Sequence, residues 1–285
     1  MTRLSSDLIS GMNETIAAYD LELVQKSGLT LRQIAARTAG LSEETLCEAF
    51  RSEYVAIIPV TAGQGVIKGF TQAVESIIEH LGCPRFITEN CDAAGLAEGI
   101  EHGASILVLA DDTRFVAINL FHKRVVDNDL ATGWSYAYAL DACVGGLQGK
   151  SVLLIGAGRV GKNALCALER LGAKVGVFDI DRPKAQLLAD KFKMKLEENL
   201  SDALDRYRLL FDASPAPDII HAEHIKPGTI ISACGIPIGL SDEAWFLVED
   251  RLIHDPLQLG TAAMLAMAVC HGLNDKSGGR IGRIA

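Results

Sequence analysis

The sequence predicts an α/β protein. It consists of an N-terminal helical segment with a small α/β domain, followed by a C-terminal Rossmann domain with a doubly wound parallel sheet. Three observations indicate this class. Residues 1–50 have helical spacing of their apolar positions. From residue 54 onward, short apolar runs alternate with helical segments, the pattern of a parallel sheet covered by helices. One of these runs ends in Gly-x-Gly-x-x-Gly, the turn that opens a Rossmann domain.

The composition of the chain indicates which kinds of partner and compartment to expect. At 285 residues the chain is long enough for one large or two modest domains, and its formal charge of −9 argues against a basic nucleic-acid surface. No apolar run reaches the length of a membrane span, and the N-terminus lacks an apolar signal core. The seven cysteines contain no Cys-x-x-Cys pair, which favours reduced thiols. We therefore expect a cytoplasmic protein with no nucleic-acid and no membrane partner.

Three helices are predicted before the first strand. The first and the third begin after side chains that cap helix N-termini, and the first two end at glycines. The second helix spans residues 31–39. The caps are Ser6, Asp7 and Ser42, and the terminating glycines are Gly28 and Gly40.

The rest of the first half is predicted to form a parallel sheet with covering helices. Strands are predicted at 54–60, 85–88, 106–110 and 115–120, and helices at 66–78 and 93–102. Residues 1–133 are therefore expected to form one domain. A helix over 131–147 joins it to the Rossmann domain of residues 134–285, which ends in a flexible tail at 277–280.

The glycine turn follows the apolar run 152–155 and precedes a helix over 162–171. Gly156 allows the tight turn, Gly158 lets the backbone approach a pyrophosphate, and Gly161 lets the helix pack on the strand. The free N–H groups of the helix N-terminus favour phosphate there. The turn therefore predicts a dinucleotide site, which Arg159 and Val160 complete.

Asp179 ends the next apolar run, 173–178, about twenty residues beyond the turn. A carboxylate at this position accepts both hydroxyls of the adenine ribose, and it repels the 2′-phosphate of NADP. The predicted cofactor is therefore NAD, although Arg182 lies close by in sequence.

Four further strands complete the predicted doubly wound domain. They lie near 195–196 and at 208–212, 229–232 and 251–254, with helices at 183–192, 200–204 and 260–271. Ligands of such sheets bind at the carboxyl ends of the strands. Ser214, Pro215 and Gly235 follow two of these strands, so they are predicted to border the nicotinamide half of the cofactor.

The same rule indicates two ligand-binding stretches in the first half. The turn from Thr61 to Gly65 is predicted to open a helix whose N–H groups hold a carboxylate, or to be a plain loop. Asp111 and Asp112 end a strand and are suited to an ammonium group, or Asp112 caps a turn. His221 and His224 lack an evident third ligand, so no metal site is predicted.

Several of these motifs together resemble the PylD family, the dehydrogenases of pyrrolysine biosynthesis. The similarity runs from about residue 54 to 269. It is carried by Ile58–Gly65, Phe86–Thr88, Leu109–Asp112, Phe115, Gly156–Gly161, Asp179, Ala213–Pro217, Gly235–Pro237, Pro256–Leu257 and Leu259–Ala262. Residues 1–50 and the tail after His271 align poorly with this family.

The resemblance implies an activity and a partner. The family oxidises the terminal amine of L-lysine-Nε-(3R)-3-methyl-D-ornithine with NAD. Ammonia is then released and the pyrroline ring closes to pyrrolysine. The substrate is thus a small, dipeptide-like amide. The family is also dimeric, which implies a homodimer here, and its N-terminal helix helps to cover the substrate.

The resemblance also implies substrate-binding residues. Asp111 matches an acidic residue of the family motif and Asn128 a polar one, while Asp255 stands where the family has Glu, one methylene longer. Together with Thr61 they form the expected substrate site. Asp111 and Asp255 are the candidate amine ligands, one acting as a base directly or through water.

Two other functions are compatible with the glycine turn. One is an NAD-dependent dehydrogenase of another amino acid derivative or of a hydroxy acid. The other is a regulator that senses NADH without turnover. The acidic chain and the absence of a DNA-reading motif weigh against a DNA-binding regulator.

Overall fold

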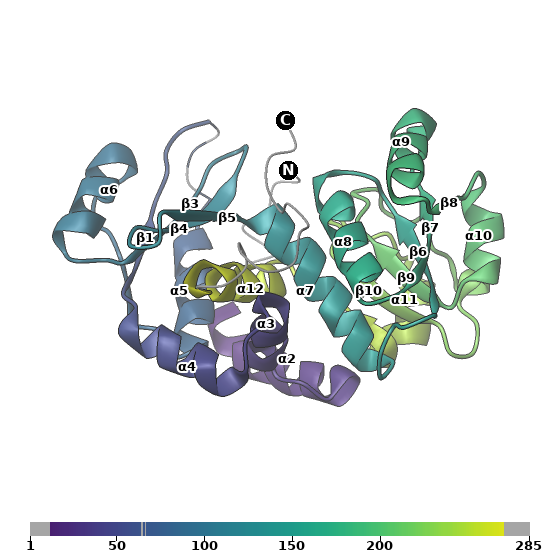
Figure 1. Cartoon of the computed structure of the whole chain (residues 1–285), viewed down its shortest axis with the longest axis horizontal. Helices are drawn as coiled ribbons and strands as arrows, with labels where there is room; N and C mark the ends of the chain where they lie inside the picture. Colours follow the sequence, from purple (N-terminus) through teal and green to yellow (C-terminus); the bar gives the residue numbers. More distant parts are fainter. Residues whose placement is uncertain (1–11, 64, 66, 271–285) are drawn as a thin grey trace.

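The computed structural model describes residues 12–63, 65 and 67–270, with backbone alone for 12–14 (Figure 1). The predicted caps Ser6 and Asp7 and the predicted tail lie outside these residues. The described chain forms one five-stranded and one six-stranded sheet. In the described part of the chain, no helix combines the length and apolar character needed to cross a membrane.

The N-terminal helices are α2 (Met12–Ser27), α3 (Leu31–Ala39) and α4 (Glu43–Ser52). Gly28 and Gly40 have the positive φ predicted for helix ends. The Ser42 side chain accepts a hydrogen bond from the Thr45 N–H, so the predicted cap of α4 is confirmed. These helices pack their apolar faces into the main core of the molecule.

The first sheet has the strand order β2-β1-β3-β4-β5. Its elements are β1 (Val55–Ile58), α5 (Phe70–His80), β2 (Arg85–Ile87), α6 (Asp92–Glu101), β3 (Ile106–Ala110), β4 (Phe115–Asn119) and β5 (Arg124–Asp127). Strands β1, β2 and β3 are parallel, but β4 and β5 run antiparallel to their neighbours. The prediction of a wholly parallel sheet is therefore wrong. The cause is the four-residue turn between β3 and β4, because a parallel connection needs a dozen residues or more.

The stretch from Thr61 to Gly65 was predicted either to open a helix or to be a plain loop. It does not open a helix, so the loop is the alternative that agrees with the structure. Helix α5 begins at Phe70, after Gly69, which has a positive φ. The N–H groups of the predicted turn are therefore not those of a helix N-terminus, and they lose the proposed role of a carboxylate cradle.

Helix α7 (Asn128–Cys143) connects the two sheets and starts three residues earlier than predicted. The predicted boundary after Gly133 falls inside this helix. A Cβ at Gly133 would lie 2.7 Å from the Val160 carbonyl oxygen and the Ala164 nitrogen. The glycine thus lets α7 pack closely on α8 (Arg159–Arg170) of the second half.

The second sheet is wholly parallel, with the order β11-β10-β9-β6-β7-β8. Numbered along this half, the order is the 3-2-1-4-5-6 of a doubly wound dinucleotide fold, as predicted. The strands are β6 (Ser151–Ile155), β7 (Lys174–Phe178), β8 (Lys195–Leu196), β9 (Leu209–Asp212), β10 (Ile230–Ala233) and β11 (Leu252–Ile253). The helices are α8, α9 (Arg182–Phe192), α10 (Leu200–Arg206), α11 (Asp242–Val248) and the short turns Ala222–His224 and Glu249–Arg251.

The last described helix, α12 (Gln258–Val269), is buried along its whole length, as its apolar sequence predicts. It packs against α3, α4, α5, α7, β4 and β5, and Figure 1 shows it among the N-terminal helices. The predicted domain boundary assigns α12 to the Rossmann domain, because the helix lies late in the sequence. Its contacts, however, are with elements of the first half. The last described helix therefore packs with the N-terminal domain.

Candidate active site

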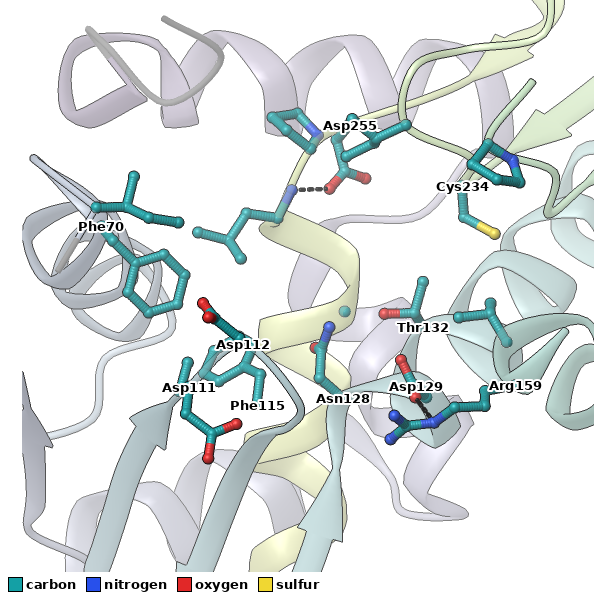
Figure 2. Close-up of a pocket in the computed structure, with 18 of the residues that line it drawn as sticks. Phe70, Asp111, Asp112, Phe115, Asn128, Asp129, Thr132, Arg159, Cys234 and Asp255 are labelled. Carbon is teal, nitrogen blue, oxygen red and sulfur yellow. Dashed lines mark hydrogen bonds and ion pairs between the residues drawn. The ribbon is translucent and has the colours of Figure 1, made fainter. Parts of the chain in front are cut away.

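A cavity of about 370 Å³ lies between the two sheets, at the carboxyl ends of their strands (Figure 2). The ends of β1 and β3 line it from one side, and the turns after β6, β9, β10 and β11 line it from the other. Helices α5, α7 and α12 complete the wall. The position agrees with the rule that ligands of parallel sheets bind beyond the carboxyl ends of strands.

The glycine turn has the geometry predicted for each glycine. Gly156 has φ +96°, and a Cβ there would lie 2.9 Å from the carbonyl oxygen of Ala213. A Cβ at Gly161 would lie 1.9 Å from the Gly156 carbonyl oxygen. A Cβ at Gly158 would meet no described heavy atom within 4 Å, and Gly158 lines the cavity. Two glycines are thus required by packing, and the third leaves open space where a phosphate is expected.

Asp179 lies beside this turn, directly after β7. Its Oδ2 accepts a hydrogen bond of 2.6 Å from the Ala157 N–H, and its Oδ1 accepts one of 2.8 Å from the Asp181 N–H. Arg182 is held by an ion pair with Glu198. The carboxylate of Asp179 is therefore fixed at the rim of the turn, outside the cavity.

The loops after β9 and β10 approach each other closely at the cavity. A Cβ at Gly235 would lie 1.9 Å from the Ser214 carbonyl oxygen, so glycine is required there. Pro215 and Gly235 line the cavity, whereas Ser214 is not among the lining residues and its hydroxyl accepts a hydrogen bond of 3.1 Å from the Ala216 N–H. The loops therefore form the wall that the strand-end rule predicted.

Asp212 lies beneath these loops and is fully buried. It accepts hydrogen bonds from the N–H groups of Ser214 (3.0 Å) and Gly239 (3.2 Å). Burial raises the pKa of the Asp212 carboxyl to about 7, and the two N–H donors only partly oppose this effect. A single buried carboxyl thus holds both loops. Apart from its place at a strand end, no sequence pattern distinguishes Asp212.

Arg159 joins the glycine turn to the first half of the molecule. Its guanidinium forms ion pairs with Asp129 (2.5 Å) and Asp127 (3.5 Å) and donates to the Thr113 carbonyl oxygen (3.0 Å). Arg114 pairs with Asp127 as well, at 2.9 Å. The predicted cofactor residue therefore also bridges the cleft. Because its side chain is half exposed, each pair contributes at most about 1 kcal/mol.

Asp111 and Asp112 follow β3 and extend in different directions. Asp111 Oδ1 accepts from the N–H groups of Thr113 and Arg114, both at 2.7 Å, and these bonds lower the pKa of the Asp111 carboxyl. The turn is thus capped by Asp111. Figure 2 shows the Asp112 carboxylate extending toward Phe70, and the carboxylate is in contact range of Gly63. Both aspartates line the cavity.

Thr61 takes a different place from the one predicted. Its N–H donates to Asp92 Oδ1 at 2.8 Å, and its hydroxyl donates to Asp92 Oδ2. Thr61 is not among the residues that line the cavity. The residues of the same stretch that do line it are Ile58, Pro59, Val60, Gly65 and Ile67.

Asn128 and Asp255 line the cavity together with residues that the sequence did not single out. The Oδ1 of Asn128 is buried and has no hydrogen-bond partner among the described residues. Asp129 follows it, and burial raises the pKa of its carboxyl against the opposing charge of Arg159. Asp255 is buried between Tyr19 and Tyr136, whose hydroxyls lie 2.8 and 2.9 Å from its Oδ2. Tyr19 lies 236 residues away in sequence, so no local pattern points to it.

Comparison with known proteins identifies the two halves. Residues 9–126 match the family model "Pyrrolysine biosynthesis protein PylD, N-terminal domain", and residues 137–237 match "Alanine dehydrogenase/PNT, C-terminal domain". The chain is 31% identical to the pyrrolysine synthase of Methanosarcina acetivorans over 251 residues, which is 86% of this chain and 96% of that protein. It is 28% identical to the pyrrolysine synthase of Methanosarcina barkeri over 93% of this chain and 97% of that one.

Two solved structures that share this fold are dehydrogenases. Shikimate dehydrogenase from Aquifex aeolicus has a TM-score of 0.52 at 15% identity, over 77% of this chain and 92% of that one. Quinate dehydrogenase from Corynebacterium glutamicum, solved in complex with NAD, has a TM-score of 0.51 at 13% identity, over 78% and 95%. The chain thus has the fold of these two-domain dehydrogenases, with the cleft between the two sheets. Within this class, the chain belongs to the pyrrolysine synthase (PylD) family.

Proposed function

We propose that the chain catalyses the NAD-dependent oxidation of the terminal amine of L-lysine-Nε-(3R)-3-methyl-D-ornithine. The resulting imine releases ammonia, and the pyrroline ring then closes to L-pyrrolysine. The observation that carries this proposal is the charge of the cleft. Its described lining contains four aspartates, Asp111, Asp112, Asp129 and Asp255, against one arginine, Arg159. An excess of carboxylates favours a substrate that carries ammonium groups.

The apolar part of the cleft suits the methylene chains of such a substrate. Phe70 and Phe115 meet edge to face, with ring centroids 5.3 Å apart. Ile67 and Leu257 also line the cavity. A mostly apolar wall with a few polar groups is the usual composition of a small-molecule site.

The residues of the glycine turn fit a dinucleotide. The open space at Gly158 leaves room for a pyrophosphate beside the N-terminus of α8, and Asp179 is fixed where a ribose is expected. A 2′-phosphate would meet the Asp179 carboxylate, while Arg182 is engaged by Glu198. This supports NAD over NADP. When bound, NAD supplies the hydride acceptor of the reaction.

The chain must also remove a proton from the substrate. A primary ammonium with a pKa of about 10.4 must be deprotonated before its carbon gives up hydride, which costs about 4.6 kcal/mol at pH 7. This is less than the barrier reduction of about 8 kcal/mol or more that enzymes commonly achieve. A positioned carboxylate, directly or through water, is sufficient for this step. Asp111 and Asp112 lie at the cleft for this role, and the free Oδ1 of Asn128 is suited to accept from the amine.

The atoms of the proposed reaction balance without a further reactant. The amine carbon loses a hydride and the nitrogen a proton, which leaves the imine. Water adds to the imine and ammonia departs, which leaves an aldehyde. The α-amine of the same ornithine part condenses with this aldehyde and releases the water, so one C=N bond closes the ring.

The test is an assay with purified protein, NAD and the synthetic amide. We expect NADH absorbance together with pyrrolysine by mass spectrometry, and at least about tenfold lower kcat/KM with NADP because of Asp179. Free lysine and ornithine are the controls. Equal NADH formation from unrelated amines or hydroxy acids would indicate a different dehydrogenase. Tight NADH binding with no turnover of any amine would indicate a regulator.

A further inference from the structure

The Asp255 carboxylate is held by donors from three separate elements. The Tyr19 hydroxyl of α2 donates to Oδ2 at 2.8 Å, and the Tyr136 hydroxyl of α7 lies 2.9 Å from the same oxygen. The N–H groups of Leu257 and Leu259, at the start of α12, donate to Oδ1 at 3.0 and 3.1 Å. A carboxylate offers about four lone-pair sites. The Tyr136 proton is shared with the Asp255 carbonyl oxygen, so these donors occupy at least three of the four sites.

The two tyrosines differ in how they are fixed. The Tyr136 hydroxyl accepts from the Asp255 N–H at 2.9 Å and lies 2.7 Å from the Asp255 carbonyl oxygen, so the backbone of Asp255 also holds it. Tyr19 reaches the carboxylate through its side chain from a distant helix. Lys26, on the same helix, donates to the Leu252 carbonyl oxygen at 2.8 Å. Helix α2 is thus joined to the end of β11 at two points, one of which touches the carboxylate.

Burial and hydrogen bonding act on Asp255 in opposite directions. Only 5% of the residue is exposed, and burial raises the pKa of the carboxyl, whereas the bonds from Tyr19 and Tyr136 lower it. The titratable groups that face it are Tyr19 from α2, Tyr136 from α7, Cys234 after β10 and the adjacent His254. The charge of this carboxylate therefore depends on its donors.

We propose that Tyr19 is a positioning residue that acts through Asp255: its hydroxyl keeps the carboxylate in place and negatively charged at the β11 end of the cleft. Asp255 then supplies negative charge to the cleft, while most of its lone pairs accept hydrogen bonds from the protein. The groups that contact the amine directly are then the carboxylates of Asp111 and Asp112 and the side chain of Asn128. The kinetic consequence rests on the proposed amine oxidation, but the effect on Asp255 does not.

The test is Tyr19→Phe, which removes one hydroxyl without changing shape. Lys26→Met is the matched control, because it removes the other bond between α2 and β11 and leaves Asp255 untouched. In Tyr19→Phe we expect the acidic limb of the plot of kcat/KM against pH to shift by about one unit toward higher pH. The reason is that losing a hydrogen bond to a charged carboxylate raises its pKa by about this amount. Lys26→Met is expected to leave that side in place. In an Asp255→Asn background, Tyr19→Phe should cause no further movement.

A second measurement needs no substrate. Unfolding free energies of the wild type and Tyr19→Phe are compared in acidic and in mildly alkaline buffer. The loss should be larger in alkaline buffer, because the bond to a charged carboxylate is about twice as strong as to a neutral one. An equal loss of unfolding free energy at both pH values would overturn the proposal. So would a Tyr19→Phe variant whose kcat/KM is lower at every pH but whose acidic limb stays at the wild-type pH. If no amine is oxidised, the proposed function fails and the unfolding comparison alone decides the role of Tyr19.

Discussion

Gly161→Ala should destabilise the protein strongly, whereas Gly158→Ala should leave its stability unchanged and weaken NADH binding. The added Cβ at Gly161 would lie 1.9 Å from the Gly156 carbonyl oxygen, so strand and helix must separate. Such overpacking costs about 1–3 kcal/mol or more. At Gly158 the Cβ meets open space, and it would occupy the place proposed for the pyrophosphate. Here we expect a loss of NADH affinity of at least about tenfold, or ~1.4 kcal/mol.

Thermal unfolding and fluorescence titration with NADH measure the two effects separately. Each variant is the control of the other, because both add one methyl group to the same turn. NADH binding at wild-type affinity in Gly158→Ala would contradict the placement of the phosphate. Wild-type stability in Gly161→Ala would contradict the steric role of that glycine.

Asp212→Asn should become progressively more stable, relative to the wild type, as the pH rises. The pKa of Asp212 is about 7 in the folded protein and 3.8 ordinarily. Between these values the unfolded chain has released the proton and the folded chain keeps it, so the wild type loses stability as pH rises. A shift of about 3 units at 1.36 kcal/mol each corresponds to about 4 kcal/mol. Asn does not titrate, so the variant escapes this loss.

Urea unfolding of both proteins across this pH range measures the difference. The exposed Asp242→Asn controls for the loss of one negative charge. We expect the Asp212→Asn difference to rise from below pH 4 to about pH 7 and then to level off. A difference that is constant with pH would show that the pKa of Asp212 is the same in the folded and the unfolded chain, which would contradict the effect of its burial.

The Rossmann half was predictable because each of its elements has a local signal. A buried run precedes Gly156, a helix with one apolar face begins at Arg159, three residues before the predicted start, and Asp179 follows the next strand. The order of its six strands then follows from alternating strands and helices. The cap of α4 by Ser42 was predictable from an equally local signal.

The first sheet was harder to predict because its pairing depends on the connections. Strand β5 has four residues with charged ends, Arg124 and Asp127, and one exposed valine, so it lacks the apolar run of a buried strand. The antiparallel pairing of β3 with β4 depends on the turn that Asp111 caps. From the sequence, Asp112 is the candidate for this cap. The place of α12 depends on contacts with the other end of the chain.

The candidate site shows the same division. Asp111, Pro215 and Gly235 were predicted because they follow the carboxyl ends of strands. Asn128 and Asp255 were predicted from the family resemblance. All of these line the cleft. Thr61 does not, because Asp92 engages both its N–H and its hydroxyl. Tyr19 and Asp212 escaped prediction because their roles come from burial and from partners distant in sequence.

The central claim is that hydride leaves the carbon that bears the terminal amine. The most direct measurement uses the synthetic amide with deuterium at that carbon, followed by mass spectrometry of the NADH and of the amino acid product. We predict that one deuterium appears in the NADH and one remains at the imine carbon of pyrrolysine. NADH that forms without deuterium would place the oxidation at another carbon and contradict the proposed function.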